Sequence, residues 1–461
     1  MNLLDSQRAF FASGRTRAYD FRRDALQKLK SSVRSHLRAL YDALWQDLHK
    51  SEAEAYLTEA ALVLREIDDQ LSRLRSRMRP RRVGTPVFLW PSRSRILCEP
   101  FGNILILAPW NYPFQLAFAP LAGAIAAGNC VVLKPSPYTP HVSAVMRQIV
   151  ESAFPADYIA VVEGHRDVNE ALLAERWDYI FFTGSPELGR TVMRAAAEHL
   201  TPVTLELGGK SPCIADNSAN VDIAARRIVW GKFLNAGQTC IAPDYLLVHE
   251  NIKSPLIERI EYWIEEFYGA EPGKSPHYGR MVNRKAFDRV CSYLSDGTIL
   301  TGGDTDPAQR YIAPTLLDLG APTDSVPVMQ SEIFGPVLPL MSYTRLDEAV
   351  EFINRHEKPL ALYYFGSPET GRNVLQRTSS GGACINDTVL HVSNDRLPFG
   401  GVGNSGMGRY HGKESFLTFS NRRSVLCSAK NWDLPLKYPP YKHFGWITKL
   451  LGGSCQFKSK F

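Results

Sequence analysis

Two patterns of apolar and polar positions follow one another along the chain. Residues 1–80 are rich in Ala, Leu, Arg, Lys and Glu, with apolar residues at helical spacing such as Leu64 and Ile67, which predicts a set of helices. From residue 103 the apolar residues instead form short continuous runs, at 103–108, 131–134, 158–162, 179–182 and 203–206. Each run is separated from the next by a stretch that can be helical. Such alternation is typical of a parallel sheet covered on both faces and predicts a doubly wound nucleotide-binding domain.

A second region of alternating helices and strands follows residue 207. Helical spacing predicts helices over 219–231 and 252–268, and short apolar runs predict strands over 245–249 and 383–386. After residue 400 the chain is rich in Gly, Ser and aromatic residues, and then in Lys and Pro. The whole pattern predicts an α/β protein with two large lobes and smaller additions.

Composition supports a globular protein and narrows its class. The 461 residues are 44% hydrophobic and 22% charged, which is typical of globular domains with enough apolar material for a large core. The formal charge of +6 is far below that of a nucleic-acid-binding protein. We find neither a secretory signal nor a run of about 18 apolar residues, so we expect a cytoplasmic protein without an integral membrane segment.

The eight cysteines are scattered along the chain without a C-x-x-C pair or a His-rich neighbour. This spacing predicts no zinc site or other metal site, and irregular spacing in a long chain favours reduced thiols. An arginine-rich stretch at 73–82 runs into Pro80 and Pro86. Near the end of a predicted helix, such a stretch favours a solvated or anion-neutralising surface over a nucleic-acid patch.

A glycine turn follows the predicted strand at 179–182. Gly184, Ser185 and Gly189 lead directly into helical spacing over 190–200. Free backbone N–H groups at a helix N-terminus suit a pyrophosphate. The two glycines are five residues apart and do not form the G-x-G-x-x-G fingerprint, so an ordinary turn between strand and helix is the alternative.

Three polar residues are candidates for chemistry. Cys240 lies in a small polar segment after a predicted helix and can act as a nucleophile if its thiolate is stabilised, although buried inert cysteine is commoner. Glu206 ends an apolar strand, where desolvation would raise its pKa and suit it as a base toward water, unless it is solvated or ion-paired. Asn111 follows the first strand, where its amide can bind an oxyanion or merely support a turn. Only their joint occurrence is specific.

Together these segments resemble the NAD(P)-dependent aldehyde dehydrogenase superfamily from residue 100 to residue 425. Seven segments match the family in its order: 109–114, 133–136, 182–185, 205–212, 237–240, 332–336 and 397–408. The segments 410–416 and 438–441, with the short N-terminus, resemble the class 3 branch. Its members are dimeric enzymes that act mainly on aromatic and medium- to long-chain aldehydes. The resemblance implies a Rossmann-like doubly wound cofactor domain, an α/β catalytic domain and a small β oligomerisation arm.

The resemblance also implies roles for individual residues. Cys240 matches the nucleophile, Glu206 the base that activates the hydrolytic water, and Asn111 the oxyanion donor, which acts with the backbone N–H of Cys240. The positions that match the cofactor site are Lys134 at the adenosine ribose, Gly184, Ser185 and Gly189 at the pyrophosphate, and Glu332 and Phe334 at the nicotinamide ribose. These roles imply a thiohemiacetal and then a thioester on Cys240, with hydride transfer to NAD or NADP and no metal.

Two positions depart from relatives. Many relatives carry a glutamate just after the Lys-Pro-Ser/Ala segment, where it binds the ribose hydroxyls of the cofactor, and this chain has Pro137 there. Without that carboxylate the repulsion of a 2′-phosphate is relieved, so we expect NADP⁺ to be accepted at a rate comparable to NAD⁺. Some class 3 relatives end in a membrane-spanning helix, but the stretch after Phe444 is too short for one. We expect a docked or disordered tail there rather than a segment resting on a membrane surface.

The expected organisation has four parts. They are an NAD(P)-binding domain (1–80 and 100–206), a catalytic domain (207–391), an arm that joins a homodimer (81–99 and 392–430) and a C-terminal tail (431–461). We expect the aldehyde to contact Tyr112, Phe114, Gln115 and the segment 388–394, whose mixed character without a free basic residue favours an apolar substrate.

Two other functions are compatible with the same segments. In a coenzyme A-acylating dehydrogenase the thioester passes to a thiol instead of water, and Glu206 argues against this because a hydrolytic base is then superfluous. A catalytically silent binding relative is the other alternative. The intact set of Asn111, Glu206, Cys240 and Glu332 argues against that function.

Overall fold

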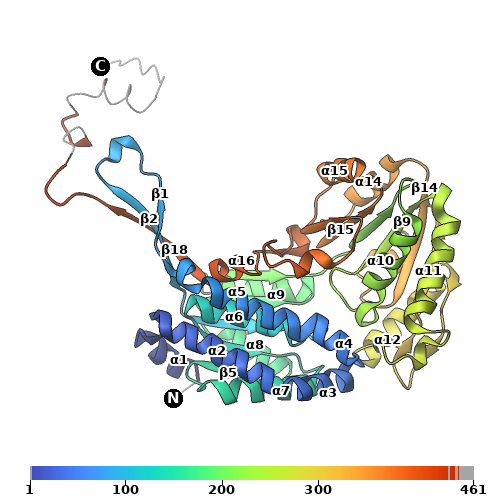
Figure 1. Ribbon diagram of the computed structural model, residues 1–461, viewed down its shortest axis with the longest axis horizontal. Coiled ribbons are helices and arrows are strands. Elements are labelled where there is room, and N and C mark those ends of the chain that lie inside the picture. Colours follow the sequence, from blue (N-terminus) through green and yellow to red (C-terminus); the bar gives the residue numbers. More distant parts are fainter. Residues whose placement is uncertain (1–2, 434–436, 442–444, 446–461) are drawn as a thin grey trace.

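The computed structural model describes residues 3–433, 437–441 and 445 of the chain. These residues form two lobes, each built around a mostly parallel sheet, and a narrow β arm that projects from the lobe of the N-terminal helices (Figure 1). The architecture is the α/β fold that the apolar pattern predicts.

The six-stranded sheet has the doubly wound arrangement expected from residues 103–206. Its order is β17-β7-β6-β3-β4-β5, and all neighbours are parallel except β17 against β7. The strand order reverses between β3 and β6, and ligands bind beyond the carboxyl ends of strands at such a switch point. The strands are β3 (Asn103–Leu107), β4 (Cys130–Lys134), β5 (Ile159–Val161), β6 (Tyr179–Thr183), β7 (Val203–Glu206) and β17 (Gly406–Met407). Each of the five predicted strands is found to within one residue at either end.

Helices from the first 200 residues cover this sheet. All 13 residues of α6 are buried, because this helix is apolar on every face and packs between the strands β3 and β4 and the helices α2 and α5. The helices are α1 (Leu3–Ala12), α2 (Tyr19–Ser35), α3 (Leu37–Leu48), α4 (Glu52–Ala55), a π-helical turn (Tyr56–Ala60), α5 (Ala61–Met78), α6 (Gln115–Ala127), α7 (Pro140–Ala153), α8 (Arg166–Ala174) and α9 (Pro186–Ala197). The helical spacing of residues 1–80 is therefore confirmed.

The second lobe surrounds a seven-stranded sheet of order β10-β13-β14-β9-β8-β15-β16, in which only β10 is antiparallel to its neighbour. Its strands are β8 (Pro212–Ala215), β9 (Tyr245–His249), β10 (Thr298–Thr301), β13 (Thr315–Gly320), β14 (Val337–Tyr343), β15 (Ala361–Phe365) and β16 (Gly382–Ile385). Its helices are α10 (Val221–Phe233), α11 (Lys253–Tyr268), α12 (Arg284–Cys291), α13 (Pro327–Gln330), α14 (Leu346–Asn354) and α15 (Pro368–Arg377). The two predicted helices and two predicted strands of this region correspond to α10, α11, β9 and β16.

The arm is a three-stranded antiparallel sheet of order β1-β2-β18. Strand β2 (Arg93–Pro100) pairs along its length with β18 (Ser420–Cys427), and β1 (Arg81–Val83) adds the third strand. The residues before β18 lie elsewhere, since β17 joins the six-stranded sheet and α16 (Lys413–Thr418) packs on α6. The segment 392–430, assigned to the arm from the sequence, is thus divided between the arm and the cofactor lobe.

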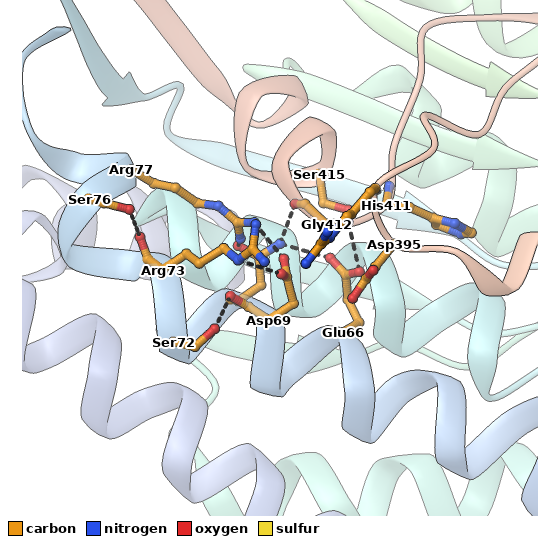
Figure 2. A network of polar contacts seen from close by, with 12 residues as sticks. Glu66, Asp69, Ser72, Arg73, Ser76, Arg77, Asp395, His411, Gly412 and Ser415 are labelled. Atoms are coloured by element: carbon orange, nitrogen blue, oxygen red, sulfur yellow. Dashed lines mark hydrogen bonds and ion pairs between the residues drawn. The ribbon is translucent and has the colours of Figure 1, made fainter.

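Figure 2 shows the polar contacts that tie α5 to the segment before α16. Gln70 Nε2 donates to the carbonyl oxygen of Gly412 at 2.7 Å, and Arg77 Nη1 donates to Gln70 Oε1 at 2.5 Å. Arg73 and Arg77 both pair with Asp69 (Figure 2). Arg73 and Arg77 of the arginine-rich stretch therefore help to hold the segment before α16 against α5.

None of the helices in the described part of the chain is long and apolar enough to cross a membrane. The stretch after Phe444, for which we expect a docked or disordered tail, lies outside the described residues apart from Gly445.

Candidate active site

Polar residues at strand ends lie along one edge of the six-stranded sheet. Leu107 at the end of β3 pairs with Lys134 at the end of β4, and Thr183 at the end of β6 pairs with Glu206 at the end of β7. Asn111 is buried in the segment that follows β3. Because parallel strands end at the same edge, the fold brings these side chains to the switch point between β3 and β6.

Cys240 reaches this edge from the second lobe. It follows α10 and a tight turn in which Asn235, Ala236 and Gly237 have positive φ angles of 53°, 51° and 74°. A Cβ atom at position 237 would overlap the carbonyl oxygen of Gly335, so the close approach of two backbones requires glycine there. Cys240 itself is half-buried as a residue.

The surroundings of Cys240 favour the neutral thiol. Burial raises the pKa of this thiol, and the carboxylates of Glu332 and Glu206 raise it further, while the backbone N–H groups of Cys240 and Ile241 act in the opposite direction. A reactive cysteine is expected to have a stabilised thiolate, and the protein groups alone do not provide one. The thiol therefore needs an additional positive charge or a base in order to ionise.

Glu206 is buried with its carboxyl group unused by the protein. Glu206 is 2% exposed, and within the described part of the chain neither Oε1 nor Oε2 has a hydrogen-bond partner. Burial raises the pKa of Glu206, and the guanidinium of Arg409 opposes this rise. Arg409 directly follows the last matched segment, and nothing in the sequence distinguishes it from other surface arginines. A buried carboxyl group with free acceptor sites can exchange a proton with a water or a ligand.

Asn111 contacts the loop that carries Cys240. Its Nδ2 donates to the carbonyl oxygen of Gln238 at 3.1 Å, and this bond uses one of the two N–H groups of the amide. Gln238 Nε2 in turn donates to the carbonyl oxygens of Asn235 (3.0 Å) and Arg280 (2.9 Å). Gln238 thereby holds the nucleophile loop next to Asn111, a role that its place in a matched motif does not reveal.

Four of the residues expected to contact the cofactor lie at the end of β4, in the turn after β6 and on α9. Lys134 is buried, its Nζ donates to the carbonyl oxygen of Pro135 at 2.8 Å, and burial lowers its pKa. Thr183 Oγ1 is buried and has no partner among residues 3–433. Ser185 caps α9 by accepting a hydrogen bond from the N–H of Leu188 at 3.3 Å. A buried cation and an unpaired hydroxyl beside a helix N-terminus fit an anionic ligand rich in hydroxyl groups, such as a dinucleotide.

Packing alone explains the two glycines of this turn. A Cβ atom at Gly184 would lie 2.5 Å from the ring of Phe182, and one at Gly189 would lie 2.7 Å from Leu207 Cδ2. The glycines are therefore compatible with an ordinary turn, as the sequence left open. It is the unpaired groups beside them that indicate a ligand.

Glu332 and Phe334 reach the same place from the loop before β14. The carboxyl group of Glu332 accepts a hydrogen bond from the N–H of Gly209, and a Cβ atom at Gly208 would overlap Glu332 Oε2. Burial raises the pKa of Glu332 to about 8. The ring of Phe334 meets Trp110 edge-on at 5.3 Å between ring centres. The two lobes therefore meet around Glu206, Cys240 and these two residues.

Lys210 and Asp244 hold the loop of Glu332 in place. Lys210 Nζ donates to Asp244 Oδ2 at 2.5 Å and to the carbonyl oxygen of Ser331 at 2.9 Å. Asp244 Oδ1 accepts from the N–H of Ile333 at 3.0 Å. Lys210 lies inside the matched segment 205–212, but its role as a support for another loop depends on the fold and has no signal in the sequence.

Comparisons with known proteins agree with this arrangement. The chain matches the aldehyde dehydrogenase family over residues 4–425. A 4,4′-diaponeurosporen-aldehyde dehydrogenase of Staphylococcus aureus is 46% identical over 449 residues, which cover 96% of this chain and 97% of the relative. Human aldehyde dehydrogenase family 3 member B1 is 47% identical over 437 residues, which cover 94% of this chain and 93% of the relative. The solved substrate-bound state of Staphylococcus aureus AldH has a TM-score of 0.95 and 45% identity, over 98% of this chain and all of that chain.

The chain therefore belongs to the aldehyde dehydrogenase family. It is an oxidoreductase that converts aldehydes to carboxylic acids, as the resemblance in the sequence implied.

Proposed function

We propose that in this aldehyde dehydrogenase Cys240 is the nucleophile, Glu206 the base of hydrolysis and Asn111 the oxyanion donor. The observation that carries this proposal is the carboxyl group of Glu206, which is buried without a partner in the described chain and acts on the pKa of the Cys240 thiol. An unpaired buried acid is costly for stability, and such groups are concentrated at reaction sites.

The reaction begins when the Cys240 thiolate adds to the aldehyde carbonyl. The new oxyanion accepts hydrogen bonds from the free N–H of the Asn111 amide and from the backbone N–H of Cys240. A bound NAD(P)⁺ would supply a positive charge that favours the thiolate and an acceptor for the hydride of the adduct. Loss of that hydride leaves a thioester on Cys240. Glu206 then takes a proton from water, the water oxygen attacks the thioester, and the carboxylic acid leaves as the sulfur regains its electron pair.

Six residues hold the cofactor in this proposal: Lys134, Gly184, Ser185, Gly189, Glu332 and Phe334. NADP⁺ is accepted as well as NAD⁺, because the half-buried Pro137 beyond β4 places no carboxylate where a 2′-phosphate would lie. A dog relative named dimeric, NADP-preferring aldehyde dehydrogenase is 45% identical over 445 residues, 95% of this chain and 97% of the relative. Steady-state kinetics with both cofactors test this, and a preference for NAD⁺ above about a hundredfold, roughly 2.7 kcal/mol, contradicts it.

The proposed substrates are apolar aldehydes, either aromatic or of medium to long chain. A small cavity of about 20 Å³ near the expected pocket is lined in part by Leu62, Ala119, Val392 and His411. Burial lowers the pKa of His411 to about 4, so this side chain is neutral. Arg65 also lines the cavity, and Asp395 lies 3.5 Å from it as an ion-pair partner. Among the described residues, the lining of this cavity therefore offers no unpaired positive charge that would attract an anionic substrate.

One residue expected in the substrate pocket lies elsewhere. Phe114 is fully buried and stacks on Phe118 at 4.4 Å between ring centres, so its ring belongs to the core of α6. Tyr112, by contrast, donates to or accepts from Thr239 Oγ1 at 2.6 Å and thus adjoins Cys240.

We further propose a cytoplasmic homodimer joined through the arm. The arm projects from the lobe of the six-stranded sheet, on the side away from the second lobe (Figure 1), and its outer strands β1 and β18 each have one edge without a neighbouring strand in the described chain. Open strand edges favour pairing with another chain. Light scattering coupled to size exclusion distinguishes this dimer from a monomer, and a variant without residues 81–99 is expected to be monomeric.

The proposed chemistry is tested with a panel of aromatic and aliphatic aldehydes in water without coenzyme A. We expect stoichiometric NAD(P)H and carboxylic acid, and loss of activity in Cys240→Ala but not in Cys291→Ala, which removes another half-buried thiol. A product that forms only when coenzyme A is added indicates an acylating enzyme instead. No NAD(P)H from any aldehyde indicates a silent relative.

A further inference from the structure

A buried ion pair from the N-terminal helices lies directly behind the segment that carries Asn111. Lys50 is fully buried, and its Nζ donates to Glu59 Oε1 at 2.6 Å and to the carbonyl oxygen of Asn111 at 2.8 Å. The same ammonium group lies 3.9 Å from the centre of the Tyr112 ring, where a cation is favourable. Lys50 therefore contacts two consecutive residues, Asn111 and Tyr112, that both bond to the loop of Cys240.

Glu59 holds the other end of this segment. It is fully buried, and its Oε2 accepts hydrogen bonds from the backbone N–H groups of Phe114 at 3.1 Å and Gln115 at 2.8 Å. These N–H groups open α6, and a carboxylate at a helix N-terminus is favourable. Burial raises the pKa of Glu59, and the charge of Lys50 opposes this rise. The pair thus holds the turn between β3 and α6 at its middle, at Asn111, and at its end, where α6 begins.

A second glutamate of the same helix holds the nucleophile loop. Glu54 Oε1 accepts from the backbone N–H of Asn235 at 2.9 Å. Glu54 and Glu59 are five residues apart, and the π-helical turn between α4 and α5 brings residues at this spacing into line. Figure 1 shows α4 where the N-terminal helices meet the second lobe. One helix face therefore supports both halves of the site.

The two halves are joined at the carbonyl oxygen of Asn111. Besides the Lys50 ammonium, this oxygen accepts from Asn235 Nδ2 at 2.8 Å. Asn235 and Ala236 have left-handed backbone angles of 53° and 51° in φ, and such conformations persist only where the surroundings hold them. With its carbonyl oxygen held by two donors, the peptide plane of Asn111 is fixed, and so is the direction of its side chain toward the oxyanion.

We propose that Lys50 is a positioning residue of the oxyanion site, acting through the main chain of Asn111, with Glu59 keeping its ammonium in place. This inference rests on the oxyanion role proposed above for Asn111. Lys50 touches neither substrate nor cofactor in this account. A pair with a purely structural role affects the stability of the fold, whereas a positioning pair also lowers kcat in the protein that is correctly folded and binds its cofactor.

The test replaces the pair without leaving a buried charge. Lys50→Met/Glu59→Gln removes the ammonium and keeps an acceptor for the N–H groups of α6, because removing one partner alone strands a charge. We expect kcat to fall about 10- to 100-fold, as for a small misplacement of a catalytic group, with the KM for aldehyde and the Kd for NADP⁺ within about threefold. If the double variant does not fold, Glu59→Gln alone serves, because the Lys50 ammonium keeps the carbonyl oxygen of Asn111, the ring of Tyr112 and the nearby charge of Glu54; a smaller fall of the same kind is expected.

A matched control separates positioning from loss of any buried cation. Arg22 is also buried, and it donates to the carbonyl oxygens of Thr16 at 2.8 Å and Ala126 at 3.2 Å, away from the site. Arg22→Met is expected to lower the thermal midpoint but to leave kcat unchanged. An equal loss of kcat in both variants indicates general destabilisation and overturns the proposal.

A mutant cycle with Asn111→Ala completes the test. Alone, Asn111→Ala is expected to lower kcat about 10²- to 10³-fold, and adding Lys50→Met/Glu59→Gln is expected to lower it by less than about threefold more. Effects that multiply instead show that Lys50 does not act through Asn111, and the proposal is wrong. If Asn111→Ala leaves kcat unchanged, the oxyanion role fails first. If only the Lys50 variant leaves kcat unchanged, the oxyanion role stands and the positioning role fails.

Discussion

Replacing Glu206 by Gln separates hydride transfer from hydrolysis. The substitution keeps the shape of the side chain and removes the base. The carboxylate of Glu332 also raises the pKa of the Cys240 thiol. Because Glu332 is assigned to holding the cofactor in the proposed function, we do not expect it to replace Glu206 as the base. General base catalysis contributes about 10²- to 10⁴-fold, or roughly 2.7–5.4 kcal/mol at 1.36 kcal/mol per tenfold. We expect steady-state turnover to fall by the upper half of that range.

Rapid mixing of Glu206→Gln with aldehyde and cofactor is expected to give a burst of one NAD(P)H per chain, close to the wild-type rate, followed by slow turnover. In the wild type the raised pKa of Glu206 makes turnover increase with pH above the ordinary range of a carboxyl group, whereas the variant loses this dependence. Glu198→Gln changes an exposed glutamate on the same lobe and should behave as the wild type. Unchanged turnover, or a burst lost together with turnover, refutes the assigned role.

Three further substitutions test other parts of the account. Pro137→Glu adds a carboxylate beyond β4 and should lower kcat/KM for NADP⁺ relative to NAD⁺ about tenfold, roughly 1.4 kcal/mol. If kinetics with both cofactors give an unchanged ratio, the 2′-phosphate does not lie near residue 137. Gly208→Ala places a Cβ atom on Glu332 Oε2 and should raise the Kd for NADP⁺ about tenfold by fluorescence titration, while Gly84→Ala, which meets nothing within 4 Å, should not. Burial raises the pKa of Glu54 from 4.5 to about 7, so the folded state holds more protons and its stability falls as pH rises through that range. Between pH 4.5 and pH 7 the free energy of unfolding of the wild type, measured in urea, should therefore fall by about 3 kcal/mol relative to that of Glu54→Gln, at 1.36 kcal/mol per pH unit. An equal pH dependence of the two proteins contradicts the raised pKa.

The strands of the cofactor lobe could be predicted because buried parallel strands are continuous apolar runs. In the second lobe the same reasoning did not identify β8, β10, β13, β14 or β15. Of these, β14 lies between β13 and β9 and contains Pro339. Proline removes a donor from the sheet and argues against a central strand. The sequence around Pro339 therefore does not indicate a strand, and pairing with β13 and β9 in the folded protein makes it one.

The candidate site shows a similar division. Cys240, Glu206 and Asn111 lie in segments that resemble a family, and the fold brings their surroundings together. Lys50 and Glu59 carry no such signal, because charged residues in a helical segment ordinarily face solvent. Their burial depends on a π-helical turn and on contact with a carbonyl oxygen 61 residues away from Lys50 in the chain. Periodicity alone predicts neither.

The nucleophilic role of Cys240 is tested most directly by the mass of the protein after one turnover. Glu206→Gln mixed with aldehyde and NAD(P)⁺, quenched in acid and digested, should show one acyl group per chain, located on Cys240 and removed by hydroxylamine. The same mixture with Cys240→Ala added to the variant should show none. An acyl group on another cysteine, or NAD(P)H formed without any acyl-enzyme, would contradict the account.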